Sequence, residues 1–241
     1  LEPVRAQLQG KVTDEMRETA RTLLGLPKRQ LFCTGVPADL SFVLTMPGEF
    51  DLTGLTCPEI PPAKNVALQK GEYFAYLARH DLLLALPYQS VNPFVDLLYE
   101  AADDPDVVSI KITLYRLAGS SRIAAALAYA AEHGKQVQCL LELRARFDEQ
   151  SNIDYSRMLE DAGCGILYGL TQYKVHTKLC LITRRCPGGI CYYTQVGTGN
   201  YNEKTAEQYT DLMLLTSDPA IGRDAARTFD RLARGETAGE T

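Results

Sequence analysis

The sequence lacks an apolar run long enough to cross a membrane, because its longest hydrophobic stretches have the length of strands and are interrupted by charges. Its N-terminus lacks the basic start and the apolar core of a signal peptide, and it also lacks an initiator methionine. These absences argue against a membrane-spanning protein. They also lead us to expect that the chain is a fragment or a processed form.

Cysteine spacings typical of metal sites are also absent. The seven cysteines form no Cys-x-x-Cys pair, and an odd count without such spacing favours reduced thiols and a cytoplasmic location. Cys139 and Cys180 lie inside apolar runs, where cysteine acts as a small hydrophobic residue. Cys186 and Cys191 flank a Pro-Gly-Gly turn and can face each other across a hairpin, but free thiols are the favoured interpretation there too.

The chain has no excess of basic residues. It carries 25 lysines and arginines against 30 aspartates and glutamates, which gives a formal net charge of −5. Proteins that coat nucleic acid usually show the opposite balance, so we expect no nucleic-acid partner. Any polyanion therefore has to be bound by a local basic site.

Length and composition allow one large or two small domains, since 241 residues of which 46% are hydrophobic can bury a substantial core. Residues 1–60 contain one predicted helix, residues 13–24, followed by a stretch punctuated by proline and glycine without a sustained period. We interpret this segment as a small α+β remnant, the end of a preceding (middle) domain with its linker. It is too poor in apolar pattern to fold alone.

Residues 61–241 are interpreted as one α/β domain, because strand and helix patterns alternate along them. A βαβαβ succession between residues 107 and 168 predicts a mixed, mostly parallel sheet with helices packed on both faces. The Pro-Gly-Gly turn then predicts a hairpin. The predicted strands are 107–115, 136–143, 164–168, 178–183, 190–196 and 209–216, and the predicted helices are 93–102, 123–132, 153–162 and 220–232.

The strongest chemical signal is a histidine between two lysines, Lys174, His176 and Lys178, at the entry to an apolar run. In an extended segment the three side chains project to the same side. The two positive charges would lower the pKa of the imidazole, which favours a neutral nucleophile for an anionic phosphoryl centre. The other interpretation is a surface histidine at the end of a strand.

Arginines follow two successive predicted strands. Arg116 ends the first, and Arg144 and Arg146 end the second. Ligands of open α/β sheets bind beyond the carboxyl ends of the strands, and a guanidinium group donates two parallel hydrogen bonds to a phosphate. These arginines therefore predict a shared anion site. Capping of helix ends, or pairing with Asp148 and Glu149, is the structural alternative.

Two later segments extend the candidate site. The Gly-Thr-Gly-Asn run at residues 197–200 can bring backbone N–H groups and the amide of Asn200 close to a ligand, although a plain turn fits as well. Tyr209 can stack on a nucleobase or simply fill core space. Asp211 is a candidate to orient His176 through its second ring nitrogen.

Several runs of residues resemble the polyphosphate kinase family, the type 1 enzymes that are phosphorylated on a histidine. The runs keep the family's order and spacing from about residue 66 to 233, and the first 60 residues resemble, more faintly, the end of the family's preceding domain. The runs are 81–84 (Asp-Leu-Leu-Leu), 87–90 (Pro-Tyr-Gln-Ser), 110–116 (Ile-Lys-Ile-Thr-Leu-Tyr-Arg), 145–149 (Ala-Arg-Phe-Asp-Glu), 152–153 (Asn-Ile), 175–178 (Val-His-Thr-Lys), 197–206 (Gly-Thr-Gly-Asn-Tyr-Asn-Glu-Lys-Thr-Ala) and 209–211 (Tyr-Thr-Asp).

The resemblance implies a phospholipase D-like fold for residues 61–241 and reversible transfer of the ATP γ-phosphate to inorganic polyphosphate. It implies that His176 is the residue phosphorylated and that Tyr209 packs on the adenine of ATP. Arg116 and Arg146 match residues of a Mg²⁺ site, which cations would meet through phosphate oxygens or water. We further expect catalytic help from Lys178, phosphate binding by Asn200, ADP as the second nucleotide, peripheral membrane association and a homo-oligomer of the full-length protein.

Two departures from the family leave alternatives open. A phospholipase D signature carries an aspartate five residues beyond Lys178, where this chain has Thr183, as suits the kinases. The family also has a second catalytic domain with another histidine, which this chain lacks. A phospholipase D-like nuclease or phosphodiesterase, with one His-Lys motif per chain paired across a dimer, is therefore one alternative. A polyphosphate-binding module without activity in this fragment is the other.

Overall fold

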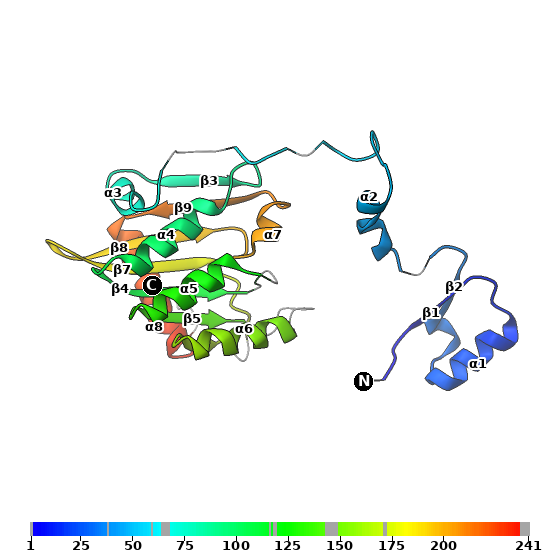
Figure 1. Cartoon of the computed structure of the whole chain (residues 1–241). Helices are drawn as coiled ribbons and strands as arrows, with labels where there is room; N and C mark the ends of the chain where they lie inside the picture. The colour runs from blue at the N-terminus through cyan, green and yellow to red at the C-terminus, as the bar shows by residue number, and fades with distance from the viewer. Residues whose placement is uncertain are drawn as a thin grey trace. The chain divides into compact units, whose positions relative to one another are not determined.

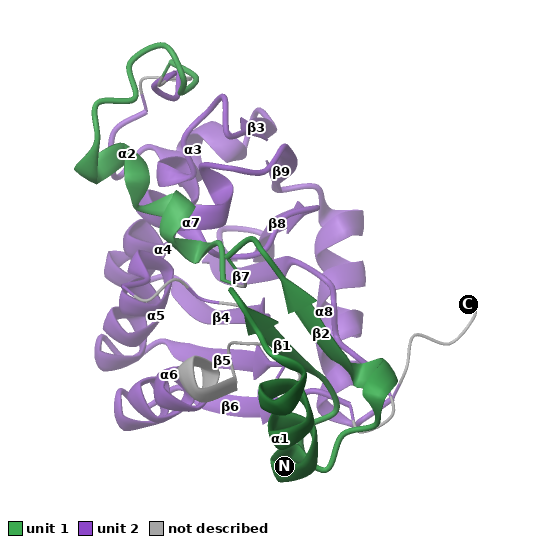
Figure 2. Cartoon of the chain, turned by 90° about the vertical axis from the view of Figure 1, so that its right-hand side faces the viewer, with its two compact units in different colours: residues 1–59 green, residues 60–241 purple. Residues whose placement is uncertain are grey.

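The chain folds into two compact units, residues 1–59 and residues 60–241, coloured green and purple in Figure 2. The computed structural model describes residues 2–37, 39–58, 60–63, 68–115, 117, 120–142, 149–170 and 173–236. The division falls next to the predicted boundary after residue 60. That the first unit is the end of a preceding domain stays a prediction.

Unit 1 pairs two parallel strands, β1 (Ala6–Gln9) and β2 (Leu31–Thr34), through the helix α1 (Asp14–Leu24). The predicted helix is confirmed: the Thr13 side chain accepts a hydrogen bond from the N–H of Met16 at 3.2 Å, and Gly25 ends the helix at a φ of 63°. Among the described residues of this unit only Leu26 is a buried hydrophobic side chain. The short helices of the unit are η1 (Lys28–Gln30), η2 (Ser41–Leu44) and α2 (Met46–Glu49).

Unit 2 is built on a seven-stranded sheet in the order β3-β9-β8-β7-β4-β5-β6 (Figure 1). Its strands are β3 (Leu82–Leu86), β4 (Val107–Leu114), β5 (Gln136–Leu141), β6 (Gly165–Tyr168), β7 (Leu179–Cys186), β8 (Gly189–Gly197) and β9 (Asp211–Thr216). Its helices are α3 (Tyr73–Leu77), α4 (Asn92–Asp103), α5 (Arg122–Glu132), α6 (Glu149–Asp161), α7 (Glu203–Ala206) and α8 (Pro219–Ala233). None of the helices in the described residues is long and apolar enough to span a bilayer.

The α/β class is confirmed, but the prediction of a mostly parallel sheet is wrong for the strand pairings. Only β4–β5 and β5–β6 are parallel, whereas β3–β9, β9–β8, β8–β7 and β7–β4 are antiparallel. The parallel part is the βαβαβ segment recognised from its periodicity. Next, β7 enters beside β4 in the opposite direction, and the Pro-Gly-Gly turn returns the chain as β8. A hairpin pattern in the sequence does not reveal which strand the hairpin joins.

Helices cover both faces of the sheet, as predicted. Figure 2 shows α4, α5 and α6 on one side and α8 on the other. The side chains of β7 alternate between these layers: Cys180 and Ile182 join the large core under α4 and α5, whereas Leu179 and Leu181 pack against Phe229 of α8. Each such side chain contributes about 1.5–3 kcal/mol by leaving water. The two layers therefore fix the register of β7, which begins directly after Lys178.

The cysteines behave as predicted in the core but not in the hairpin. Cys139, Cys164 and Cys180 are buried free thiols, in agreement with their interpretation as small hydrophobic residues. Cys186 and Cys191 form a disulfide across the β7–β8 hairpin, with their Cα atoms 6.0 Å apart. The favoured interpretation as free thiols is wrong for this pair, because the tight turn of the hairpin brings the two Cα atoms to a separation that suits a disulfide.

Candidate functional site

The predicted site residues that the structure describes lie where five strands end or begin at one edge of the sheet, which we call the histidine edge. The strands β4 and β5 end there, at Leu114 and Leu141, and β7, antiparallel to β4, begins there at Leu179. The ends of β8 and the start of β9 meet at the same edge, where Gly197 pairs with Met213. The loops that leave this edge carry the residues chosen from the sequence. Ligands of open α/β sheets bind in such a place.

The segment that carries His176 is held by side chains instead of by a strand ladder, since residues 174–178 have no regular secondary structure. Ahead of the histidine, the N–H of Val175 donates to Glu142 Oε2 at 2.9 Å. Behind it, Thr113 Oγ1 donates to the carbonyl of Thr177 at 2.8 Å and accepts from the N–H of Leu179 at 3.1 Å. These bonds anchor the segment on both sides of His176.

His176 is exposed, and its surroundings disfavour the protonated form of its imidazole. Partial burial is the main cause that lowers the pKa of the imidazole from its ordinary value of 6.5, and the charges of Lys178 and Lys174 lower it further. The lowered pKa agrees with the expectation from the two lysines, although burial is the larger cause. The ring of Tyr115 meets the imidazole edge to face, with centroids 5.1 Å apart and an interplanar angle of 80°.

Lys178 lies beneath the histidine rather than beside it. Its residue is only 5% exposed, its Nζ donates to the carbonyl oxygen of His176, and Nζ lies 5.4 Å from the ring centroid of Tyr115. Burial lowers the pKa of the Lys178 amine, and attraction to Asp211 partly opposes this. The lysine therefore places a buried positive charge within electrostatic reach of the exposed imidazole.

The Gly-Thr-Gly-Asn run packs against the start of β9. Thr198 Oγ1 donates to Asp211 Oδ1 at 2.7 Å and accepts from the N–H of Leu212 at 3.0 Å. A Cβ on Gly199 would lie 2.4 Å from Asp211 Oδ2, so this close approach requires glycine. The proposed orientation of His176 by Asp211 is wrong in this structure, because the carboxylate accepts from the nearby Thr198 hydroxyl and makes no hydrogen bond to the imidazole.

Asn200 is the last residue of the Gly-Thr-Gly-Asn run, and Tyr209 lies two residues before β9. The side-chain oxygen of Asn200 is buried and has no hydrogen-bond partner among the described residues, and Tyr209 is 62% exposed. An exposed ring at this edge is available for stacking. Arg116, Arg144 and Arg146 lie outside the described residues. The binding roles of Asn200, Tyr209, Arg116 and Arg146 stay predictions.

Sequence reasoning missed three residues of the site, Thr113, Tyr115 and Glu142. Thr113 and Glu142 are each 2% exposed; Thr113 lies near the end of β4, and Glu142 directly follows β5. A polar side chain at a buried position is costly unless it is hydrogen-bonded. The sequence gives little signal for either residue, because both strands contain other polar residues, such as Lys111 and Gln138.

The described residues do not provide a magnesium site of their own. They contain no group of three or more His, Cys, Asp or Glu side chains that could hold a metal ion, and Mg²⁺ prefers oxygen ligands. The carboxylate of Asp211, whose charge acts on Lys178, already accepts a hydrogen bond from Thr198. Arg116 and Arg146 lie outside the described residues, so Mg²⁺ near them stays a prediction.

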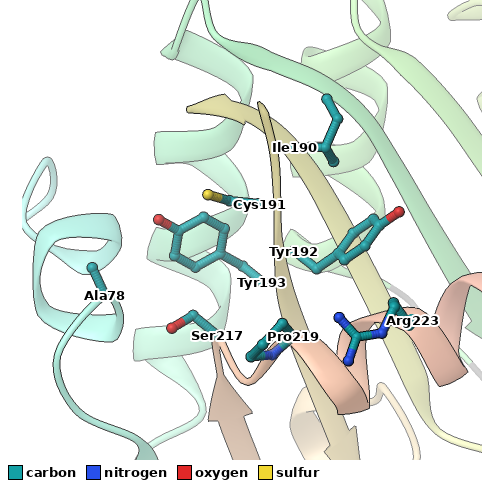
Figure 3. A pocket seen from close by; sticks show the side chains of 8 residues that line it. All are labelled: Ala78, Ile190, Cys191, Tyr192, Tyr193, Ser217, Pro219 and Arg223. Atoms are coloured by element: carbon teal, nitrogen blue, oxygen red, sulfur yellow. The ribbon is translucent and has the colours of Figure 1, made fainter. Parts of the chain in front are cut away.

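A separate cavity of about 500 Å³ opens at the other end of the sheet (Figure 3). It is lined at the start of β8 by Tyr192 and Tyr193 and at the start of α8 by Pro219 and Arg223. The strand β8 runs from this cavity to Gly197 at the histidine edge. The cavity therefore contains none of the predicted site residues.

The chain is similar to known polyphosphate kinases. It is 38% identical to the polyphosphate kinase of Staphylococcus haemolyticus over 95% of this chain and 32% of that protein, and 46% identical to that of Streptomyces coelicolor over 96% of this chain and 32% of that protein. The chain thus spans about a third of the length of these curated relatives.

Solved structures show the same likeness. The crystal structure of polyphosphate kinase from Porphyromonas gingivalis matches with a TM-score of 0.63 and 35% identity, covering 76% of this chain and 31% of that one. The phospholipase D family member Nuc from Salmonella typhimurium matches with a TM-score of 0.51 at 13% identity, covering 67% of this chain and 99% of that one. The second match shows the phospholipase D-like fold alone.

A family model described as polyphosphate kinase C-terminal domain 1 matches residues 72–238. This match covers most of unit 2, including the histidine edge. The chain therefore belongs to the polyphosphate kinase family.

Proposed function

We propose that this chain carries the phosphohistidine of a polyphosphate kinase, which transfers the ATP γ-phosphoryl group reversibly to inorganic polyphosphate. The observation that carries the proposal is His176 itself: an exposed imidazole with a lowered pKa, whose backbone carbonyl oxygen accepts a hydrogen bond from the buried Lys178. Because the chain belongs to the polyphosphate kinase family, we propose ATP and polyphosphate as the substrates of this site. We propose phosphorylation of His176 for this chain and the full cycle for a protein of the relatives' length.

In the first step, a neutral imidazole nitrogen of His176 attacks the γ-phosphorus of ATP. A nitrogen–phosphorus bond forms, the bond between the γ-phosphorus and the bridging oxygen breaks, and ADP leaves. In the second step, a terminal oxygen of polyphosphate attacks the phosphohistidine. The nitrogen–phosphorus bond breaks, the chain grows by one phosphate and the imidazole is regenerated. A low pKa supports the first step, because a protonated imidazole has no lone pair with which to attack. It also supports the second step, because a less basic imidazole is the better leaving group.

In this proposal the remaining residues bind and orient the substrates. Lys178 stabilises negative charge on the transferred group from behind the imidazole. Arg116, Arg146 and Asn200 bind phosphate oxygens, and Tyr209 stacks on adenine. Mg²⁺ remains the proposed cofactor, bound to phosphate oxygens or water rather than to carboxylates of the described residues.

Labelling with γ-labelled ATP tests the proposal. The protein should acquire acid-labile, base-stable label, and His176→Ala should abolish it. His133→Ala is a matched control, because His133 lies at the end of α5, where its Nδ1 is 2.8 Å from the carbonyl oxygen of Tyr129. Label that persists in His176→Ala would contradict the assignment.

The same variants separate the two alternatives. Thr183 lies within β7 and supplies no carboxylate, which disfavours a phosphodiesterase. Cleavage of bis-nitrophenyl phosphate without ATP, lost in His176→Ala, would establish that activity instead. Tight binding of polyphosphate with no labelling of His176, in this chain and in a protein of the relatives' length, would instead support a polyphosphate-binding module without kinase activity.

A further inference from the structure

Glu142 is a buried carboxylate that joins three parts of the histidine edge. It follows β5 directly and is 2% exposed. Its N–H donates to the carbonyl oxygen of Leu114, the last residue of β4, at 3.0 Å, and its Oε2 accepts from the N–H of Val175 at 2.9 Å. One residue therefore ties the ends of two strands to the residue that precedes His176.

This tie is needed because the segment around His176 has no ladder of its own. Residues 174–178 are irregular, so their conformation depends on bonds from neighbouring elements. Val175 is buried, and an unpaired N–H at a buried position is costly. A shift of the Glu142 carboxylate therefore reaches the imidazole through a single residue.

The space for the carboxylate is defined on its other side by Gly169. The N–H of Gly169 donates to the carbonyl oxygen of Leu141 at 2.9 Å, which fixes this residue just after β6. A Cβ added to Gly169 would lie 2.8 Å from Glu142 Oε2 and 3.4 Å from its carboxyl carbon. Any residue other than glycine at position 169 would therefore push the Glu142 carboxylate away from its place.

We propose that Glu142 is a positioning residue, which sets the imidazole of His176 for phosphoryl transfer by holding the N–H of Val175. The inference rests on the proposed function of His176. Glu142 touches neither the imidazole nor the phosphate in this proposal and acts through Val175. Small errors in the position of a nucleophile are expensive, since a displacement of about 1 Å can slow a reaction about 100-fold.

The first test moves the carboxylate without changing it. Gly169→Ala should displace the Glu142 side chain, whereas Gly165→Ala is the matched control, because a Cβ there would meet only the carbonyl oxygen of Val137 at an ordinary 3.7 Å. The readout is the rate at which phosphoramidate phosphorylates His176, with a nitrogen–phosphorus bond forming on the imidazole as ammonia leaves. We expect Gly169→Ala to slow this rate by about 10- to 100-fold and Gly165→Ala to leave it unchanged.

The second test compares two buried glutamates. Glu142→Asp keeps the charge but withdraws the acceptor from Val175, and Glu142→Gln keeps an acceptor in place. The control is Glu100→Asp, because Glu100 accepts the N–H groups of Gly71, Tyr73 and Phe74 at 2.8–3.0 Å away from the histidine edge. We expect slower labelling of His176 in Glu142→Asp, substantial recovery in Glu142→Gln, and a lower unfolding midpoint with normal labelling in Glu100→Asp.

Nuclear magnetic resonance of the His176 ring makes the outcomes distinct. If ATP and phosphoramidate both fail to label His176 in the unaltered protein, the proposed function fails, and the ring signals still report on Glu142. Altered ring signals in Glu142→Asp and Gly169→Ala, but not in Glu100→Asp and Gly165→Ala, support positioning. Ring signals and labelling rates that match the unaltered protein in both Glu142→Asp and Gly169→Ala would overturn it.

Discussion

The two ends of β7 each carry a cation, and the two cations are held in opposite ways. Lys178 precedes the strand at the histidine edge, is buried, and donates to the carbonyl oxygen of His176. Arg184 lies near the other end, where its Nε is 2.8 Å from Asp104 Oδ2 and its second terminal nitrogen is 3.4 Å from Asp106 Oδ2. Among the described residues, no carboxylate lies within ion-pair distance of Lys178.

The pKa values of the two side chains move in opposite directions, because one cation has a carboxylate partner and the other is buried without one among the described residues. The hydrogen bond to Asp104 raises the pKa of Arg184, whereas burial lowers the pKa of Lys178. A buried charge without a counter-charge destabilises a fold. The comparison therefore indicates that the ion pairs of Arg184 stabilise the fold, whereas Lys178 has the charge, unpaired within the described part of the chain, that the proposed function assigns to phosphate.

The largest expected effect comes from removing the unpaired cation. Lys178→Met keeps the bulk of the side chain but loses the charge behind His176, so labelling from γ-labelled ATP should fall by about 100- to 1000-fold. The free energy of unfolding should stay unchanged or rise by on the order of 1 kcal/mol, because the cost of burying the amine disappears. Labelling kinetics and urea unfolding measure the two quantities.

Lys174→Met is the matched control for this change. Lys174 also lies two residues from His176, but its side chain is exposed, so water screens its charge and labelling should change much less. Equal losses of labelling in both variants would mean that general positive charge, and not the buried position of Lys178, matters.

The paired cation should give the reverse result. Arg184→Met leaves Asp104 and Asp106 without their partner and should lower the free energy of unfolding by about 2 kcal/mol, or the midpoint by roughly 4–8 °C for a unit of this size. Labelling of His176 should not change under folding conditions. Calorimetry measures the midpoint, and the neighbouring exposed Arg185→Met is the control. A loss of labelling in the folded Arg184→Met protein would contradict the separation of the two ends.

The sequence predicted best what local pattern determines. The alternation of apolar runs and helical periods identified β4, β5 and β6 with their crossover helices, and the charges around His176 predicted the direction of its pKa shift. The Pro-Gly-Gly turn identified the β7–β8 hairpin. Each of these features depends on residues that are close together along the chain.

What the sequence did not predict depends on contacts between distant residues. Glu142 and Val175 are 33 residues apart, and they meet only because β7 inserts beside β4 in the antiparallel direction. The same insertion brings Thr113 beneath the histidine segment. Asp211 was predicted to orient His176 because their elements are close, but in the structure its carboxylate accepts a hydrogen bond from the Thr198 hydroxyl. Strand order therefore decides which polar groups become partners.

The smallest expected effect is a shift in pH dependence. The folded protein holds the pKa of His176 below 6.5, so the reactive neutral form should predominate at and above that pH and decline as the pH falls through the lowered value. Lys178→Met removes one positive charge that opposes protonation, and the midpoint should move up toward 6.5. A titration of the His176 ring signals by nuclear magnetic resonance measures it.

Arg184→Met sharpens this measurement, because its charge lies at the far end of β7 and should leave the His176 midpoint in place. Lys174→Met should move it upward as well, since the charge of Lys174 also lowers the pKa, though less than that of Lys178. Two results would contradict this difference between the two ends of β7. One is a His176 titration midpoint above 6.5 in the unaltered protein, and the other is the same midpoint with and without Lys178.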